Sequence, residues 1–404
     1  MNIDPEKTRS VAVFAPLYPP AFRGGGPIRS IAALAANSPG DLLPLVVTAD
    51  SDLGADARLA VTTGTWTQRG RAEVYYADSR SLWRLMQAFL ASRRRRPAML
   101  HFNSFFNPRF TIAPLLLWKA GLWGRRTPVL LSPRGEFGFG ALQRRSFKKN
   151  AYVRLFRLFM LHKDVIWHST AAHETADIRR IWGGSVQIVE RENDTLLPRQ
   201  AMEASGPPRD TLRAVFLGRL VEHKGLQILL AALRHVPEGM TLDVFGSRED
   251  DAYARVCEEY AAALPEHIQV AFRGELDPDR VVCTLNEYDA LLLPTAGENF
   301  GHVIAEAMAA SCIVTTTPYT PWTEILNSGG GVIVPDRSDT AWGSAIHTLA
   351  SEDPTARQAR RQKIAHAYNS WAARAPSPNV WTTALSLFRN ESPAESLPIE
   401  AGPQ

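Results

Sequence analysis

The sequence predicts an α/β protein made of two doubly wound parallel sheets, each in its own Rossmann-like domain. Short apolar runs alternate with segments of helical pattern along the chain, and this alternation is typical of parallel sheets. The chain has 404 residues, which is more than one hydrophobic core normally serves. A polar, proline-bearing stretch at 197–210 separates two series of strands, and we interpret it as a linker.

The first series begins with an apolar strand at 10–18, which a glycine-rich loop connects to a helix at 28–37. Its further strands are expected at 42–50, 98–103, 128–133 and 165–170. The strands of the second series are expected at 212–218, 241–246, 268–274, 290–294, 312–317 and 331–335. These patterns predict domains at 1–200 and 201–375, a final helix at 376–390 and a disordered tail at 391–404. Because such sheets bind ligands outside the carboxyl ends of their strands, we expect the two domains to face a cleft.

The composition predicts a cytoplasmic globular protein. Hydrophobic residues make up 45% of the chain and charged residues 21%, and both values are usual for globular proteins. No apolar run approaches the ~20 residues that cross a bilayer, and the acidic N-terminus does not resemble a signal peptide. The three cysteines lack metal-ligand spacing, so we expect them to be reduced residues of the core.

The segment 297–310, GENFGHVIAEAMAA, is the most informative part of the chain. It follows the apolar strand at 290–294, so Glu298 is expected on a loop at the carboxyl end of a strand and Glu306 in the next helix. Two carboxylates spread over a loop and a helix suit two parts of one extended, hydroxyl-rich ligand, and a nucleotide sugar is such a ligand.

The Glu298–Glu306 spacing resembles the Glu-(seven residues)-Glu signature of family 4 glycosyltransferases, which are retaining enzymes of the GT-B fold. The resemblance continues through the second half of the chain, from 215 to 334. The segments 15–30, 129–149 and TPYTPW at 317–322 resemble a branch that builds bacterial surface polysaccharides. The resemblance implies an acceptor-binding first domain, a donor-binding second domain and a final helix that crosses back to the first.

A diphosphate site is predicted after the strand at 212–218. Arg219 and Lys224 precede a helix at 226–236, and two cations near a helix N-terminus stabilise the charge of a departing diphosphate. The resemblance implies that they clamp the diphosphate without a metal and that no cofactor is needed. The alternative is a pair of solvated surface cations.

The resemblance assigns the donor contacts around the two carboxylates. Glu306 is expected to accept hydrogen bonds from the ribose hydroxyls, and Glu298 from the hydroxyls of the donor sugar. Glu298 could instead be only a helix cap. The remaining donor-binding residues of the second domain are predicted to be Gly246, Asn299, Phe300, Gly301, His302 and Val303.

In the first domain, Gly25 and Gly26 lie in a loop that the resemblance places against donor phosphates or the acceptor, with Arg29 assisting. A dinucleotide site is the alternative, because Asp50 follows the next strand. That site requires a third glycine three residues after Gly26, and Arg29 occupies this position. We therefore do not expect NAD to bind.

Two further residues of the first domain are acceptor or phosphate candidates. Many relatives carry a histidine where this chain has Arg134, and arginine does not release its proton, so a role in holding the acceptor or leaving phosphate is expected. His101 ends a neighbouring strand and is either a site residue or a structural histidine. We interpret His168 and His173 as structural.

Basic residues concentrate in the first domain, at Arg93 to Arg96 and again at 144–163, where they alternate with large apolar residues. A basic helix of this kind suits the surface of an anionic membrane, although a core helix with a solvated basic face is an equal alternative. No nucleic-acid motif accompanies the charge.

Together these patterns predict a retaining hexosyltransferase that uses a nucleoside-diphosphate sugar and a saccharide acceptor, expected to be lipid-linked. The resemblance implies displacement on one face of the sugar, with the departing phosphate taking the proton of the acceptor hydroxyl. An epimerase or hydrolase of the same fold and a non-catalytic nucleotide-sugar-binding subunit are the alternatives. The base, the sugar and the acceptor are not specified by the sequence.

Overall fold

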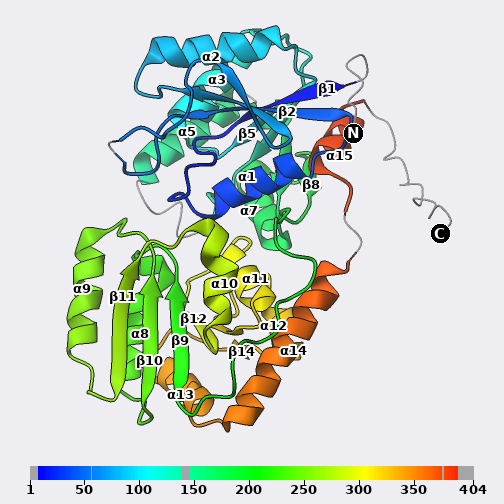
Figure 1. Cartoon of the computed structure of the whole chain (residues 1–404). Coiled ribbons are helices and arrows are strands. Elements are labelled where there is room, and N and C mark those ends of the chain that lie inside the picture. Colours follow the sequence, from blue (N-terminus) through cyan, green and yellow to red (C-terminus); the bar gives the residue numbers. More distant parts are fainter. Residues whose placement is uncertain (1–7, 56, 139–145, 160, 375–376, 390–404) are drawn as a thin grey trace, which may run out of the picture. The chain divides into compact units, whose positions relative to one another are not determined.

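The computed structural model describes residues 8–55, 57–138, 146–159, 161–374 and 377–389, which divide into two units (Figure 1). The first unit comprises Met1–Thr195 and Pro376–Gln404, and the second comprises Leu196–Ala375. Each unit contains a parallel sheet covered by helices, so the predicted fold class is confirmed. The tail predicted at 391–404 lies outside the described residues.

The sheet of the first unit has the strand order β3-β4-β2-β1-β5-β6-β7-β8. All neighbouring strands are parallel except β3 and β4, which are antiparallel. The sequence patterns predicted β1, β2, β5, β6 and β7 but did not reveal β3, β4 and β8. The strands are β1 (Arg9–Phe14), β2 (Leu42–Ala49), β3 (Trp66–Arg69), β4 (Ala72–Ala77), β5 (Met99–Asn103), β6 (Val129–Ser132), β7 (Ile166–Ser169) and β8 (Ile188–Glu190).

Both faces of this sheet are buried, because side chains alternate between two cores. In β1, Val11 and Val13 lie in the core that includes α1 and α15, whereas Ala12 and Phe14 lie in the core that includes α2, α3, α5 and α7. The helix α15 therefore packs on the first unit, with Trp381 fully buried. The helices are α1 (Gly26–Ala36), α2 (Leu82–Arg94), α3 (Ala113–Lys119), α5 (Ser146–Leu158), α6 (Leu161–Asp164), α7 (Ala172–Trp182) and α15 (Val380–Arg389).

The sheet of the second unit is parallel throughout, in the order β11-β10-β9-β12-β13-β14. The chain reverses its direction of winding between β9 and β12, and ligands of doubly wound sheets bind at such a reversal. The strands are β9 (Leu212–Leu217), β10 (Met240–Phe245), β11 (Ile268–Gly274), β12 (Ala290–Leu293), β13 (Ile313–Thr316) and β14 (Val332–Ile333).

The helices of the second unit form two groups: α8 contacts α9 and α13, whereas α11 and α12 contact α14 and α10 contacts α11. Cys257 and Cys312 are buried as predicted, but Cys283 on α10 is exposed, so the expectation that all three cysteines lie in the core is wrong. The helices are α8 (Leu226–Leu233), α9 (Asp251–Ala262), α10 (Val281–Asn286), α11 (His302–Ala309), α12 (Thr323–Ser328), α13 (Asp339–Ala350) and α14 (Pro354–Ala372).

The stretch interpreted as a linker is fixed to the second unit. The Tyr368 hydroxyl donates to the Pro198 carbonyl at 2.6 Å, and the Ala201 N–H donates to Asn369 at 2.7 Å. The Met202 N–H donates to the Ala309 carbonyl at 2.7 Å. Residues 198–202 are therefore held along α14 and the end of α11.

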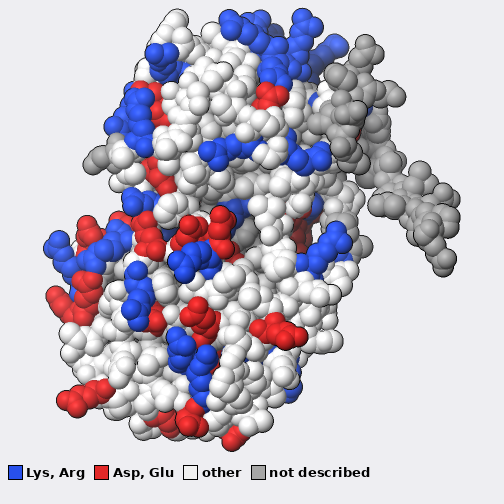
Figure 2. Space-filling model, in the orientation of Figure 1, with Lys and Arg blue, Asp and Glu red and all other residues white. Residues whose placement is uncertain are grey.

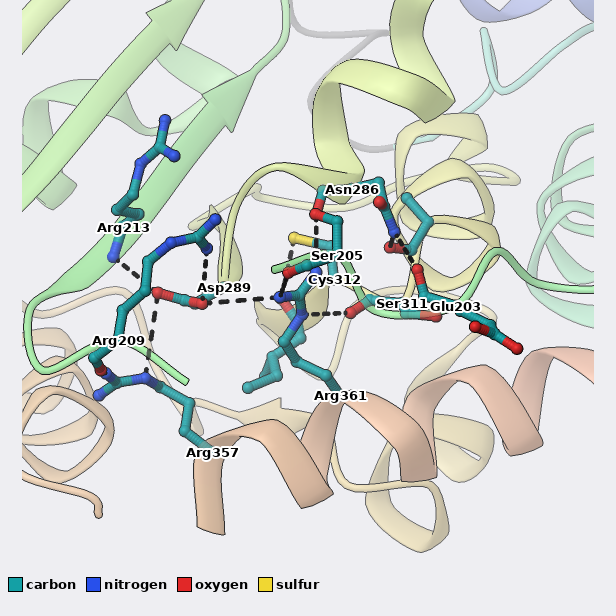
Figure 3. Close-up of polar contacts among 12 residues, drawn as sticks. Glu203, Ser205, Arg209, Arg213, Asn286, Asp289, Ser311, Cys312, Arg357 and Arg361 are labelled. Atoms are coloured by element: carbon teal, nitrogen blue, oxygen red, sulfur yellow. Dashed lines mark hydrogen bonds and ion pairs between the residues drawn. The ribbon is translucent and has the colours of Figure 1, made fainter. Parts of the chain in front are cut away.

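A buried arginine of α14 holds several chain segments of the second unit together (Figure 3). Arg361, which is 1% exposed, donates to the carbonyls of Ser311, Ser205 and Asn286 at 2.9, 3.2 and 2.7 Å. Asn286 ends α10 and Ser311 follows α11, so the guanidinium lies where two helix dipoles are negative. Asp289, 3.8 Å away, supplies the nearest carboxylate.

Ser311 follows α11, and its φ of +53° lies in the left-handed region. Its hydroxyl donates to the Met202 carbonyl, and its own carbonyl accepts from Arg361. These two bonds hold a conformation that serine adopts at some cost.

Candidate functional site

The two predicted catalytic loops of the second unit meet at the reversal between β9 and β12. After β9, the chain forms a short 3₁₀ turn, Glu222–Lys224, and after β12 it forms the 295–301 loop that leads into α11. The Lys224 Nζ lies 2.6 Å from Glu298 Oε1, and these side chains are only 13% and 11% exposed. Two residues 74 positions apart in the sequence thus form one largely buried ion pair.

This pairing determines the charge of Glu298. Burial alone would raise the pKa of the Glu298 carboxyl, but the Lys224 ammonium and a hydrogen bond from Thr295 outweigh burial and hold the pKa below its usual value. Glu298 is therefore ionised at neutral pH. An ionised carboxylate accepts hydrogen bonds and does not donate them, as the predicted contact with sugar hydroxyls requires.

Arg219 follows β9, but the structure pairs it with Glu249 at 2.6 Å and not with the Lys224–Glu298 pair. Both of these side chains are about one-third exposed, at 35% and 36%. Exposed pairs of this kind are weak, so a bound anion could compete with Glu249 for the guanidinium. The diphosphate role of Arg219 stays a prediction.

Gly246 lies where the ends of two strands approach each other closely. A Cβ atom at this position would lie 1.8 Å from the Gly218 carbonyl oxygen, so no other residue fits here without moving the backbone. The Gly246 N–H donates to the Gly274 carbonyl at 2.8 Å, which joins the ends of β10 and β11. The structure thus explains the glycine by packing, and its contact with the donor stays a prediction.

The start of α11 carries the remaining predicted donor contacts. Gly301 caps the helix with φ +79°, and the Phe300 side chain before it is 3% exposed. The first N–H groups of a helix have no partner within the helix and favour anions. Glu306 follows one turn later and is only 6% exposed, so it is a buried carboxyl of the helix and not a solvated surface glutamate.

Three other predicted residues surround this helix start. The His302 ring contacts the Phe300 ring, with centroids 4.7 Å apart, and Val303 is half-buried against the core. Asn299 lies in the 295–301 loop beside Glu298.

Arg337 belongs to the same site and was missed by sequence reasoning. Its Nε donates to the Pro294 carbonyl at 3.0 Å, and its Nη2 donates to the Glu222 carbonyl at 3.2 Å. One guanidinium therefore connects the loop after β9 with the loop after β12. Arg337 belongs to no motif, so no local signal could have indicated this contact.

In the first unit, the glycine-rich loop leads from β1 into α1 as predicted. Gly25 is the cap residue of α1 with φ +68°, Gly26 begins the helix, and Arg29 lies half-buried in its first turns. Asp52, which sequence reasoning missed, holds this loop by accepting hydrogen bonds from the N–H groups of Phe22 and Arg23 at 2.9 and 3.2 Å.

Asp50, the acidic residue of the dinucleotide alternative, is 3% exposed and forms an ion pair with Arg58 at 3.3 Å. Burial raises the pKa of its carboxyl.

The contacts of His101 favour the structural interpretation of this residue over its alternative, a contact with the acceptor or a phosphate. The ring is fully buried, and its Nδ1 accepts from the Trp381 indole at 3.0 Å. Its Nε2 therefore carries the proton and donates to Ser132 Oγ at 2.8 Å, and Ser132 in turn donates to His168 Nδ1 at 2.8 Å. Both ring nitrogens of His101 are occupied, so neither is available to a substrate.

The same chain of hydrogen bonds explains His168, whose Nε2 donates to the Arg191 carbonyl at 3.0 Å. Burial lowers the pKa of His168 to about 3 and holds the pKa of His101 well below its usual value. Both rings are therefore neutral at physiological pH, and the network joins α15 to β5, β6 and β7.

Arg134 follows β6 with a left-handed φ of +56°. Its Nη2 donates to Asn103 Oδ1 at 2.8 Å and its Nη1 to Asn193 Oδ1 at 2.5 Å. Burial lowers the pKa of this guanidinium to about 10, against the opposing effect of Glu174 and Asp194, so Arg134 stays charged at neutral pH. Both hydrogen-bond acceptors of the charged Arg134 guanidinium are neutral side-chain amides. This arrangement suits the predicted contact of Arg134 with an anionic group.

The helix α5 exposes both apolar and basic side chains. Phe147 and Leu158 are 86% and 72% exposed, whereas Phe156 on the opposite side is buried. Lys148 and Arg154 are also exposed on this helix. Arg144 and Arg145 of the predicted basic segment lie outside the described residues.

Further Lys and Arg side chains gather along the edge of the first unit where α2 lies (Figure 2). Within the described ranges, no helix is long and apolar enough to span a bilayer.

Residues 199–366, which make up most of the second unit, match the family model described as "Glycosyl transferases group 1". The chain is 28% identical over 219 residues to a D-inositol 3-phosphate glycosyltransferase of Corynebacterium glutamicum (strain R), covering 50% of this chain and 51% of the relative. It is 31% identical over 201 residues to a phosphatidyl-myo-inositol mannosyltransferase of Mycobacterium leprae (strain TN), covering 46% and 52%. The chain spans about half the length of these curated relatives.

Solved structures resemble the fold over almost the whole chain. Sucrose-phosphate synthase from Thermosynechococcus elongatus matches with a TM-score of 0.67 at 15% identity, covering 95% of this chain and 98% of that one. HepE of Anabaena, in complex with UDP-glucose, matches with a TM-score of 0.63 at 13% identity, covering 94% and 98%. These structural similarities identify the fold of this chain as the GT-B fold.

Proposed function

We propose that this protein is a retaining glycosyltransferase that moves a hexose-type sugar from a nucleoside-diphosphate sugar to a saccharide acceptor. The observation that carries the proposal is the Lys224–Glu298 pair at the reversal of the second sheet. The pair consists of a cation, which suits a diphosphate, beside an ionised carboxylate, which suits sugar hydroxyls. The family match of residues 199–366 and the names of the relatives support this class of reaction.

In the proposed reaction, the bond between the anomeric carbon and the diphosphate oxygen breaks, and the acceptor hydroxyl oxygen bonds to that carbon on the same face. The departing phosphate takes the hydroxyl proton. Lys224, with Arg219 once it exchanges Glu249 for the donor, stabilises the charge that grows on the diphosphate. We propose that Glu298 orients the sugar and that Glu306 accepts from the ribose hydroxyls. These roles require neither a metal nor a cofactor.

The proposed acceptor is a lipid-linked saccharide of bacterial surface polysaccharide synthesis, handled at the cytoplasmic face of the membrane. Arg134 supports an acceptor or leaving group that carries negative charge, because amides hold its guanidinium at the end of β6. The exposed apolar and basic side chains of α5 support peripheral contact with anionic lipids.

The donor site is tested by thermal melting of the protein with UDP, GDP, ADP or NAD, each with and without EDTA. A ligand at about 100 times its Kd adds roughly 2.7 kcal/mol to stability, so one nucleoside diphosphate should raise the Tm whether or not EDTA is present. Stabilisation by NAD alone would favour a dehydrogenase, and no stabilisation by any nucleotide would remove the support for a donor site.

Transfer is tested with the matching labelled nucleotide sugar and a membrane extract. We expect label to enter the lipid-linked fraction, Glu306→Ala to raise the KM for the donor, and Lys224→Ala to lower kcat. Free sugar or an isomer formed without acceptor would indicate a hydrolase or epimerase. Binding without turnover in any extract would indicate a non-catalytic subunit.

Membrane contact is tested by flotation with vesicles of phosphatidylglycerol or of phosphatidylcholine alone. The protein should float with the anionic vesicles only, and Leu158→Ser should weaken this binding because Leu158 is exposed and contributes apolar area. Leu116→Ser on α3, at 54% exposure, controls for loss of an exposed leucine elsewhere. Equal flotation with both kinds of vesicle, or none, would contradict the electrostatic part of the proposal.

A further inference from the structure

The 295–301 loop is held in place by the segment 316–322, which follows β13 in the second unit. Thr317 Oγ1 donates to the Thr295 carbonyl at 2.8 Å, and the Glu298 N–H donates to the Tyr319 carbonyl at 3.0 Å. At the end of the segment, the Trp322 indole Nε1 donates to the Phe300 carbonyl. The 316–322 segment therefore holds the backbone of the loop at its beginning, middle and end.

Trp322 is fixed in a single position by its surroundings. Its side chain is 1% exposed, and the Phe300 ring packs against it edge to face with centroids 5.4 Å apart. On the other side, the Trp371 ring of α14 lies 4.9 Å away at an angle of 61°. Trp322 therefore connects the 295–301 loop to α14, and its N–H points at one loop carbonyl.

The Phe300 carbonyl and the Gly301 N–H belong to the same planar peptide group. In a trans peptide these two groups point in opposite directions, so a bond that fixes the carbonyl also fixes the direction of the N–H. Gly301 caps α11, and its N–H is among the donors expected to bind sugar or phosphate oxygens. Without the indole bond, the left-handed glycine leaves this peptide free to rotate.

We propose that Trp322 is a positioning residue of the donor site: its indole N–H aims the Gly301 N–H, and through it the start of α11, at the bound nucleoside-diphosphate sugar. This inference rests on the proposed function and adds a residue that contacts no substrate itself. It gives a physical role to the tryptophan of the TPYTPW segment.

The test compares Trp322→Phe with Trp118→Phe in the full chain. Trp118 of α3 is also buried, at 6% exposure, and its indole Nε1 donates to the Thr127 carbonyl at 2.9 Å. Both variants lose one indole hydrogen bond to a backbone carbonyl, but only one of these carbonyls lies in the 295–301 loop. We expect Trp322→Phe to raise the Kd of the nucleoside diphosphate identified by melting about fivefold, as one lost hydrogen bond does, and Trp118→Phe to leave it unchanged.

A second readout follows the indole N–H resonances of ¹⁵N-labelled wild-type protein while that nucleoside diphosphate is added. The Trp322 resonance should move on binding, and the Trp118 resonance should not. This titration decides the question even if Trp322→Phe does not fold.

An unchanged Kd in a folded Trp322→Phe, or an unmoved Trp322 resonance while wild-type protein binds, would overturn the positioning role alone. Wild-type protein that binds no nucleoside diphosphate would overturn the donor site and this role together.

Discussion

Removing the ammonium of the Lys224–Glu298 pair should destabilise the second unit in a way that depends on pH. At 2.6 Å, two unit charges attract with about 6 kcal/mol at an effective dielectric constant of ~20, and much of this offsets the cost of burying them. Removing one partner of a buried pair costs about 3–5 kcal/mol. These side chains are still 11–13% exposed, so we expect a cost at the lower end of this range. Lys224→Met should lower the free energy of unfolding by about 3 kcal/mol at pH 7.5.

The pH dependence follows from the pKa of Glu298. In the wild-type protein Lys224 holds this pKa below its usual value, so the pair contributes stability above the unfolded pKa of about 4.3 and loses it as the pH falls through the folded pKa. In Lys224→Met, burial is opposed mainly by Thr295, and the folded carboxyl takes up a proton more readily. The difference between the two proteins should therefore be largest near neutral pH and smallest near pH 4.

The assay is urea unfolding of the full chain without donor at several pH values between 7.5 and 4. Glu298→Gln in the Lys224→Met background should recover most of the lost stability, because no buried charge is left unpaired. Lys119→Met, which removes a Lys119–Asp164 pair whose members are 49% and 38% exposed, should cost less than about 1 kcal/mol. A loss that does not change with pH, or that the double variant does not recover, would refute this account of the pair.

Three further predictions concern stability. Between pH 6.5 and 3 the unfolded chain binds a proton at His168 that the folded chain does not, so His168 should account for about 2 kcal/mol of the stability lost on acidification to pH 5. His168→Gln should reduce the loss measured by urea unfolding by this amount. Gly246→Ala should lower the stability measured by thermal melting by about 3 kcal/mol, because the added Cβ would clash with the Gly218 carbonyl. A Cβ at Gly274 meets nothing within 4 Å, so Gly274→Ala should cost only the ~1 kcal/mol of placing an alanine in a left-handed backbone. Arg361→Met should cost about 3 kcal/mol, because it removes three hydrogen bonds and leaves the buried Ser311 carbonyl unpaired. Arg360→Met, whose pair with Glu352 is 30% and 19% exposed, should cost under about 1 kcal/mol, and equal melting shifts would contradict the role of Arg361 in joining these segments.

Local patterns in the sequence were sufficient to predict the architecture and much of the candidate site. Apolar strands alternate with helical segments, and strands buried on both faces of a parallel sheet require such continuous apolar runs, so β9, β12 and β13 could be placed from the sequence. The segment around Glu298 and Glu306 was informative because a polar loop between a buried strand and a helix is typical of the sheet edge where such proteins bind ligands.

Local patterns misled where a residue's partners come from distant parts of the chain. His101 ends a strand, as a site residue would, but Trp381 and Ser132 occupy its ring nitrogens from 280 and 31 positions away. The composition of the polar stretch beginning at Leu197 predicts a linker, but composition alone could not indicate that Tyr368 and Asn369 hold it to the second unit.

The sequence by itself determined that two parallel sheets form and which loops follow the carboxyl ends of their strands, because the alternation of strands and helices and the placement of glycines and charges are local properties. Only the tertiary structure decided that Lys224 neutralises Glu298, that Arg337 joins their two loops and that Trp322 holds the Phe300 carbonyl. Each of these contacts depends on the order in which the strands lie side by side. That order brings residues 74 and 22 positions apart to within hydrogen-bonding distance, and no local pattern records it.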